Sequence, residues 1–297
     1  MRAKSVADLI GNTPLVRVNH LLKKKNVQLF LKLEGNNPAG SVKDRPALNM
    51  IRSALERKEI GRDTRLIEAT SGNTGIALAM IAGLYQLDIE LVMPENSTRE
   101  RVQTMRAYGA RVTLTPAEKG IEGSRDYAER KVEREGYFML NQFANPDNWK
   151  AHYMTTGPEI WRDTGQQVTH FVSAMGTTGT IMGVSTYLKE KNRNIQIIGA
   201  QPTDESRIPG IRKWPEEYLP SIFDRTRVDR ILEVSESEAR EMSVRLAREE
   251  GVFAGMSSGG SVATALKIAN EIDEGLIVSI ICDRGDRYLS SDLFDKA

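Results

Sequence analysis

The chain has 297 residues, 40% of them hydrophobic and 27% charged, and a formal net charge of +1 at pH 7. This composition is typical of a globular protein, and the balanced charge gives no electrostatic reason to expect nucleic acid or an anionic membrane as a partner. A chain of this length exceeds one simple core of typical size, so two lobes are expected.

Targeting and metal-binding signals are weak in this sequence. The densest apolar runs, 76–85 and 276–282, are too short to span a bilayer, and residues 1–11 lack the apolar region of a secretory signal. The single cysteine, Cys282, excludes a disulfide within the chain and is expected to be a small buried residue of an apolar strand. A single cysteine fits a reducing compartment, so we expect a cytoplasmic protein. The histidines show no ligand spacing with one another or with Cys282, so we expect no metal site.

Short apolar runs alternate with segments of helical periodicity along almost the whole chain. We expect strands at 15–18, 27–33, 64–69, 89–93, 110–114, 138–140, 168–173, 195–201 and 276–282. Helices are expected at 43–55, 76–85, 98–108, 123–134, 157–163, 181–189, 235–251 and 262–272, with 203–226 irregular. Ser235 and Glu238 form a capping box in this pattern. The alternation favours an open α/β layer fold, which holds ligands at the carboxyl ends of its strands.

The segment 35–45 combines a loop with a lysine at a predicted helix start. Glycines, asparagines and Pro38 mark the loop, and Ser41 is expected to cap a helix that Lys43 opens. A cation is disfavoured at that end of a helix, so the pKa of Lys43 should be lowered, which suits an amine that reacts with a carbonyl. A solvated surface lysine is the alternative at this point. Gly35 and Gly40 have Walker spacing, but Ser41 follows them instead of lysine.

Three turns rich in glycine, serine and threonine share a predicted layout of strand, turn and helix: 70–75, 176–180 and 255–261. Each places backbone N–H groups and small hydroxyls at a helix start, where an anion is favoured. None fits the dinucleotide fingerprint. One such turn alone is a common structural feature, whereas three turns together with a candidate reactive lysine point to a site.

Four segments together resemble the pyridoxal-phosphate motifs of cysteine synthases, which belong to the tryptophan synthase β-like, fold-type II superfamily. These segments are 40–45 (GSVKDR), 70–75 (TSGNTG), 176–180 (GTTGT) and 257–260 (SSGG), and residues 12–15 (NTPL) match the opening of the family. The resemblance extends from about residue 8 to 290. Segments 209–214 and 281–288 resemble the B-type branch more than the A-type branch.

The resemblance implies a fold and a domain organisation. It implies an α/β fold of two three-layer αβα lobes with open, mostly parallel, twisted sheets. It places a smaller mobile lobe, with Lys43 and the 70–75 loop, at residues 37–150. The larger lobe, with the phosphate loop, would comprise 1–36 and 151–297. A homodimer is the usual state of the family.

The resemblance also assigns site residues. Lys43 would hold pyridoxal 5'-phosphate as a Schiff base, Asn73 would bind the ring oxygen beside that bond, and Ser257 would face the pyridine nitrogen, with Ser258 as the other choice. The phosphate would be held by Gly176, Thr177, Thr178, Gly179 and Thr180. Substrate-binding residues would be Thr70, Ser71, Gly72, Thr74, Gln142 and Arg212. Arg212 would meet an anionic sulfur donor, and Gln142 and Arg212 also have purely structural alternatives.

The implied activity is cysteine biosynthesis by β-replacement. O-acetylserine with sulfide or thiosulfate would give L-cysteine or S-sulfocysteine and acetate. A hydroxyl at the pyridine nitrogen makes the cofactor a weaker electron sink, which favours rapid loss of a β leaving group. Alternatives are a fold-type II serine or threonine dehydratase, an O-phosphoserine-using cysteine synthase, and a non-catalytic anion-binding protein. The sequence leaves open the sulfur donor and any association with serine acetyltransferase.

Overall fold

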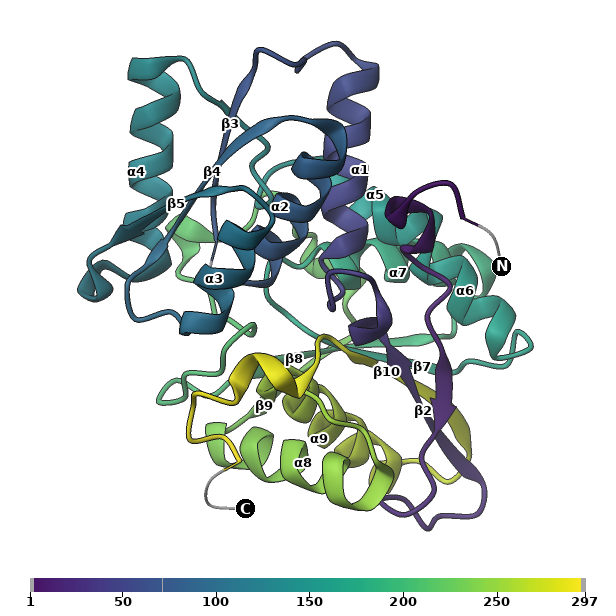
Figure 1. Cartoon of the computed structure of the whole chain (residues 1–297). Coiled ribbons are helices and arrows are strands. Elements are labelled where there is room, and N and C mark those ends of the chain that lie inside the picture. Colours follow the sequence, from purple (N-terminus) through teal and green to yellow (C-terminus); the bar gives the residue numbers. More distant parts are fainter. Residues whose placement is uncertain (1–2, 71, 295–297) are drawn as a thin grey trace.

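The computed structural model describes residues 3–70 and 72–294. Their strands form two mostly parallel sheets (Figure 1). One sheet has four strands in the order β5-β4-β3-β6. The other has six strands in the order β1-β2-β10-β7-β8-β9. The predicted α/β class is confirmed, and no described helix is long and apolar enough to cross a membrane.

The four-stranded sheet is parallel throughout and lies in the upper part of Figure 1. Its strands are β3 (Arg65–Ala69), β4 (Asp88–Pro94), β5 (Arg111–Thr115) and β6 (Phe138–Met139). Its helices are α1 (Asp44–Glu56), α2 (Asn73–Tyr85), α3 (Arg99–Ala107) and α4 (Gly120–Glu135). Helix α2 is apolar on nearly every side because it lies inside this lobe, where its Ile81 packs with Met50 of α1 and Leu66 of β3.

The six-stranded sheet is parallel apart from one edge. Its strands are β1 (Leu15–Arg17), β2 (Val27–Leu33), β7 (His170–Ala174), β8 (Gln196–Pro202), β9 (Arg230–Val234) and β10 (Gly275–Ile281), and only the β1–β2 pairing is antiparallel. Helices α8 (Glu236–Glu250) and α9 (Met256–Glu271) cover one face, and α6 (Thr156–Asp163) and α7 (Gly179–Lys191) cover the other (Figure 1). Helix α5 (Pro146–Met154) packs between α1 and α7 and so joins the two lobes.

Among the described residues, one α-helix and one strand lie where neither is predicted. Helix α5 begins at Pro146 with Asn145 as its N-cap, whose side chain accepts a hydrogen bond from Asp147 N–H. An asparagine followed by proline is a helix-start signal, and our sequence analysis assigns it to a turn. Strand β9 follows the irregular segment, pairs with β8 and is likewise not predicted. Apart from the start of the helix predicted at 262–272, the remaining strands and helices are found within a few residues of their expected bounds.

Two predicted helix starts are wrong. Helix α1 begins at Asp44, and Lys43 occupies the N-cap position without a side-chain cap. Ser41 lies two residues before the N-cap position, in the loop, where its hydroxyl accepts a hydrogen bond from the Lys43 N–H at 3.2 Å. Helix α9 begins at Met256, so most of the predicted turn 255–261 is helical, and it follows helix α8 instead of a strand. By contrast, the capping box of Ser235 and Glu238 is present.

Candidate active site

A cavity of about 660 Å³ lies where the carboxyl ends of strands from both sheets meet. Pro94 ends β4, Ala174 ends β7, Pro202 ends β8 and Cys282 follows β10, and all four line the cavity. Parallel sheets commonly bind ligands at this edge, because the loops that leave the strands gather there. The cavity is therefore the candidate active site.

Lys43 reaches this cavity from the loop before α1. Its side chain is half-buried, and desolvation by burial lowers the pKa of its amine, although the negative charges of Asp283 and Glu34 oppose that shift. Across residues 3–70 and 72–294, no carboxylate lies within ion-pair distance of Lys43 Nζ. An amine held in this way loses its proton more readily than an ordinary lysine, so it can act as a nucleophile or base.

The turn between β7 and α7 leaves a buried hydroxyl without a partner. Thr178 has a left-handed backbone (φ 69°) and is the N-cap of α7. Its Oγ1 is buried and has no hydrogen-bond partner among the described residues. An unpaired donor beside the first N–H groups of a helix suits an anion, and Gly176, Thr177 and Thr180 of the same turn also line the cavity. These residues fit a phosphate group.

Close packing around this turn explains its glycines. A Cβ on Gly179 would lie 2.0 Å from Oδ1 of Asn148, and one on Gly176 would lie 2.8 Å from the carbonyl oxygen of Gly210. Gly179 itself does not line the cavity. Trp214 Nε1 donates to the carbonyl of Gly176 at 2.7 Å and so ties the turn to the 203–226 segment.

Two side chains of helix α5 contact the hydroxyls of the same turn. Asn148 Nδ2 donates to Thr177 Oγ1 at 3.4 Å, and His152 Nε2 lies 3.3 Å from Thr180 Oγ1. Burial lowers the pKa of His152, so its ring is neutral at pH 7. Neither Asn148 nor His152 was found from the sequence, since both belong to the helix that was not predicted.

The two candidate serines before β10 have different surroundings. Ser257 lines the cavity, whereas Ser258 is fully buried and its hydroxyl accepts a hydrogen bond from the Cys282 N–H at 2.9 Å. Cys282 is not a buried core residue as expected, because it is half-buried in the cavity wall. Burial raises the pKa of its thiol to about 11.

The hydroxyl of Thr70 binds two N–H groups within the turn after β3. Thr70 is fully buried, and its hydroxyl accepts hydrogen bonds from the N–H groups of Gly72 and Gly75, both at 3.0 Å. Thr70 and Gly72 do not line the cavity, whereas Thr74 and Gln142 do. The Thr74 hydroxyl donates to Gln142 Oε1 at 2.7 Å. Ser71 lies outside the described residues.

Asn73 lies at the cavity wall within a hydrogen-bonded group that the sequence analysis did not find. Its Nδ2 donates to Asp283 Oδ2 at 2.7 Å, and Arg287 donates to its Oδ1. The Tyr288 hydroxyl donates to the same Asp283 oxygen at 2.8 Å. The carboxylate of Asp283 therefore fixes Asn73 at the start of α2.

Arg212 lies at the outer part of the cavity, on the 203–226 segment. It forms an ion pair with Glu122 of α4 and lies 5.0 Å over the ring of Trp214. Its side chain is 43% exposed, so a ligand entering from solvent can reach it. The Glu122 partner means that an anion would compete with a carboxylate for this guanidinium.

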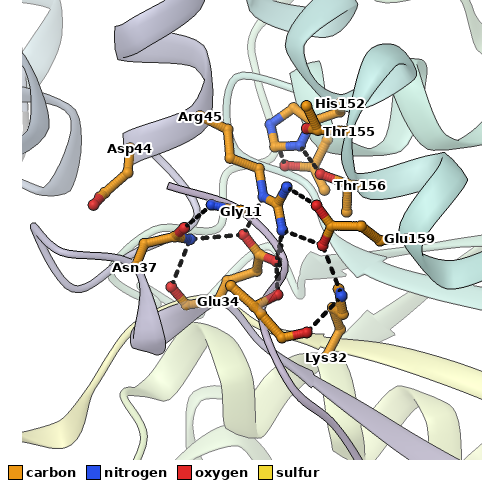
Figure 2. Close-up of polar contacts among 12 residues, drawn as sticks. Gly11, Lys32, Glu34, Asn37, Asp44, Arg45, His152, Thr155, Thr156 and Glu159 are labelled. Carbon is orange, nitrogen blue, oxygen red and sulfur yellow. Dashed lines mark hydrogen bonds and ion pairs between the residues drawn. The ribbon is translucent and has the colours of Figure 1, made fainter. Parts of the chain in front are cut away.

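A buried group of charges lies behind Lys43, where α1 meets the six-stranded sheet and α6 (Figure 2). Arg45 donates to Glu34 and Glu159, each at 2.7 Å in its shortest contact. Lys32 is completely buried and lies 2.8 Å from Glu159 and 2.7 Å from the carbonyl oxygen of Thr13. Every charge here has an opposite partner, so the group fixes the start of α1. Within the described ranges, no cluster of histidine, cysteine and carboxylate side chains could hold a metal ion.

Comparison with known proteins agrees with this geometry. Residues 6–283 match the family described as "Pyridoxal-phosphate dependent enzyme". The chain is 58% identical to cysteine synthase B of Pseudomonas aeruginosa, over 98% of this chain and 97% of that protein. It is 54% identical to cysteine synthase B of Escherichia coli, over 97% and 95%. A solved structure of cysteine synthase from Entamoeba histolytica superimposes with a TM-score of 0.93 at 35% identity, covering 99% of this chain and 91% of that one. The chain therefore belongs to the family of pyridoxal-phosphate dependent enzymes.

Proposed function

We propose that this protein is a pyridoxal-phosphate-dependent cysteine synthase that converts O-acetylserine and sulfide into L-cysteine and acetate. One observation carries the proposal: the amine of Lys43, whose pKa is lowered, shares a cavity with the unpaired buried hydroxyl of Thr178 at the start of α7. A reactive amine and an anion site in one cavity are what a phosphorylated aldehyde needs. The high identity to two cysteine synthases over nearly the whole chain supports the choice of reaction.

We assign the cofactor-binding roles as follows. Lys43 Nζ would bond to the aldehyde carbon, and the 176–180 turn would hold the phosphate through N–H groups and hydroxyls. Asn73 would donate to the ring oxygen and Ser257 would face the ring nitrogen. The lining positions of Asn73 and Ser257, and the commitment of Ser258 to a backbone N–H, support these assignments.

The chemistry divides between the cofactor and the chain. When bound, pyridoxal phosphate supplies an electron sink for the α-carbon of the substrate. Lys43 Nζ, as a neutral amine, takes the proton from that carbon while acetate leaves from the β-carbon, and it returns the proton after sulfide has bonded there. The lowered pKa favours the unprotonated amine that the first step requires.

We assign the substrate carboxylate to the turn after β3 and its neighbour Gln142. Thr74 and Gln142 line the cavity; Gln142 would donate through its remaining Nε2 hydrogen and Thr74 through its backbone N–H, because the Thr74 hydroxyl already donates to Gln142. Thr70, Ser71 and Gly72 would contribute through the shape and N–H groups of the turn. Arg212 would attract an anionic sulfur donor such as thiosulfate, which would give S-sulfocysteine. Its exposure at the outer end of the cavity supports that role.

The larger-scale organisation is also a proposal. We infer that a smaller lobe of about residues 37–150, containing the four-stranded sheet, moves against the rest of the chain (1–36 and 151–297) when substrate binds. The separate apolar cores of the two sheets support such a division. We further propose a homodimer in the cytoplasm, which analytical ultracentrifugation and cell fractionation test.

The decisive experiment compares products and rates across substrates. Purified protein supplied with pyridoxal phosphate receives O-acetylserine or O-phosphoserine, each with sulfide or thiosulfate. We expect cysteine with O-acetylserine and sulfide as the main product, and Lys43→Ala should form neither cysteine nor the absorbance of the lysine-bound cofactor. Pyruvate as the main product would support a dehydratase. A wild-type protein that stays colourless after cofactor addition would support a non-catalytic anion-binding protein.

A further inference from the structure

Glu68 is a buried carboxylate that the proposed reaction does not use. It lies near the end of β3, two residues before the 70–75 turn, and it is 1% exposed. Its Oε2 accepts a hydrogen bond from the Asn141 N–H at 2.8 Å, and its Oε1 accepts one from the Gln142 N–H at 3.0 Å. Both carboxylate oxygens thus hold successive N–H groups of the chain that leaves β6.

The contacts of Glu68 hold the peptide in an unfavourable backbone conformation. Asn141 has a φ of 55°, which lies in the left-handed region that side chains other than glycine rarely adopt. Burial raises the pKa of the Glu68 carboxyl to about 7, and the N–H groups of Gln142 and Asn141 oppose that shift because they favour its ionised form. Two hydrogen bonds to one carboxyl group offset the cost of the backbone conformation. Glu68 therefore determines the direction in which the chain turns after β6, and with it the place of Gln142.

The backbone N–H, the backbone carbonyl and both side-chain polar atoms of Gln142 each form a hydrogen bond. Its N–H is bound by Glu68, and its carbonyl oxygen accepts from Asn148 Nδ2 at 2.7 Å. Its side-chain Nε2 donates to the carbonyl of Ala69 at 2.8 Å, and its Oε1 accepts from Thr74. Because a carbonyl can only accept, the Ala69 contact fixes which end of the amide is nitrogen. One Nε2 hydrogen remains available to the cavity that Gln142 lines.

We propose that Glu68 is a positioning residue: by clamping the N–H groups of Asn141 and Gln142, it sets the orientation in which Gln142 and Thr74 receive the carboxylate of the amino-acid substrate. This inference rests on the proposed function, since it deepens the substrate-binding role given there to Gln142. Glu68 does not line the cavity and acts only through the peptide that it holds. Its loss should weaken ground-state binding of the substrate and leave the proton transfer by Lys43 intact.

The test compares Glu68→Gln with a matched control in the neighbouring strand. The glutamine side chain in this variant can accept a hydrogen bond from one of the two backbone N–H groups through its oxygen. Its NH₂ group faces the other N–H, so one hydrogen bond is replaced by a repulsive contact between donors. Glu90 of β4 is the control: it is also buried, accepts from Thr113 Oγ1 at 2.8 Å, and pairs with Ile67, so it faces the opposite side of the sheet. Glu90→Gln perturbs the same sheet without touching the Gln142 turn.

We expect Glu68→Gln to raise the KM for O-acetylserine about tenfold, with kcat and the dissociation constant of pyridoxal phosphate within about twofold of wild type. Glu90→Gln should leave that KM within about twofold. In a Gln142→Ala background, Glu68→Gln should change KM less than about twofold, because the residue through which it acts is gone. An unchanged KM in Glu68→Gln, an equal change in both variants, or an undiminished effect in the Gln142→Ala background would overturn the proposal.

Two further measurements keep the result decisive. If Glu68→Gln does not fold, Glu68→Asp keeps the carboxyl group but is one methylene too short to hold both N–H groups, and its KM should rise by at least about threefold. If the wild type forms no cysteine, the proposed function fails, and the variants are compared by titrating the cofactor absorbance with L-serine. Glu68→Gln should then weaken L-serine binding about tenfold and Glu90→Gln should not; equal binding would contradict the role of Glu68 independently of the reaction.

Discussion

The two sides of the start of α1 treat their polar groups in opposite ways. On the side shown in Figure 2, Arg45 and its neighbours form a buried group in which each charge has an opposite partner. On the cavity side, Lys43 has no ion pair with a described residue, and Thr178 keeps a buried hydroxyl without a partner. Paired groups stabilise the fold, whereas unpaired ones cost stability and remain available to a ligand. The paired charges around Arg45 therefore belong to the scaffold of the site, whereas Lys43 and Thr178 belong to the surface that faces the ligand.

The largest effect is expected from Lys43→Ala. Activity with O-acetylserine and sulfide should fall about a thousandfold or more, because the base is lost. The free energy of unfolding at pH 7 should not fall by more than about 1 kcal/mol, since the removed amine has no ion-pair partner. Enzyme assays and urea unfolding of the same preparation measure both quantities. Activity within tenfold of wild type, or a large loss of stability, would remove the distinction between the two sides.

Arg45→Met should have the opposite profile. Removing this guanidinium leaves Glu34 buried without its ion-pair partner and Glu159 with Lys32 alone, so the free energy of unfolding should fall by about 3–5 kcal/mol. Arg52→Met, on the exposed side of the same helix, is the matched control and should lose no more than about 1 kcal/mol. Equal losses in the two variants would mean that the buried pairing does not stabilise the fold.

Acid should weaken the paired side through Glu159. Burial alone would raise the pKa of this carboxyl, but hydrogen bonds and charge from Arg45 and Lys32 outweigh burial and lower the pKa from 4.5 to about 2. A lowered carboxyl pKa contributes stability that is present above 4.5 and is lost as the pH falls through about 2. The stability difference between wild type and Glu159→Gln should therefore shrink between pH values of about 5 and 3 in urea unfolding. A difference that stays constant or grows on acidification would exclude this linkage.

The smallest effect is expected from Thr178→Gly, on the cavity side of the start of α1. Thr178→Gly relieves a left-handed backbone at φ 69° and removes the unpaired hydroxyl, so the cofactor-free protein should be more stable by up to about 1 kcal/mol. The dissociation constant of pyridoxal phosphate should nevertheless rise about tenfold. Gln166→Gly, at φ 67° and away from the cavity, is the control and should leave cofactor binding unchanged. Tighter cofactor binding by Thr178→Gly would show that the hydroxyl is not a phosphate donor.

Local sequence patterns predicted most of the fold. The capping box at Ser235 and the apolar run of β10 were found because their signals lie within a few residues of each other. Helix α5 was missed since Asn145 and Pro146 are both turn and helix-start residues, and only packing of the following helix between α1 and α7 distinguishes the two. Ser41 is not the N-cap because the helical hydrogen bonds begin at Lys43, whose carbonyl oxygen accepts from the Ala47 N–H at 3.0 Å.

The site divides in the same way. Motifs in the sequence identified Lys43, Asn73, Thr74 and Ser257, which all line the cavity. They also named Thr70 and Gly72, which do not line it, because a motif includes residues that shape a turn along with those that face a ligand. No local pattern marks Glu68, whose partners follow it by more than seventy positions in the chain.

The sequence by itself determined the alternation of strands and helices, the family and the reactive lysine, because short-range propensity and contiguous motifs encode them. Only the tertiary structure decided which of the polar groups around Lys43 have a hydrogen-bond or ion-pair partner. Pairing depends on burial and on contacts between distant segments, such as Arg45 with Glu159 and Glu68 with the turn after β6. Those contacts set the charge of each group, and the charge sets what the group can do.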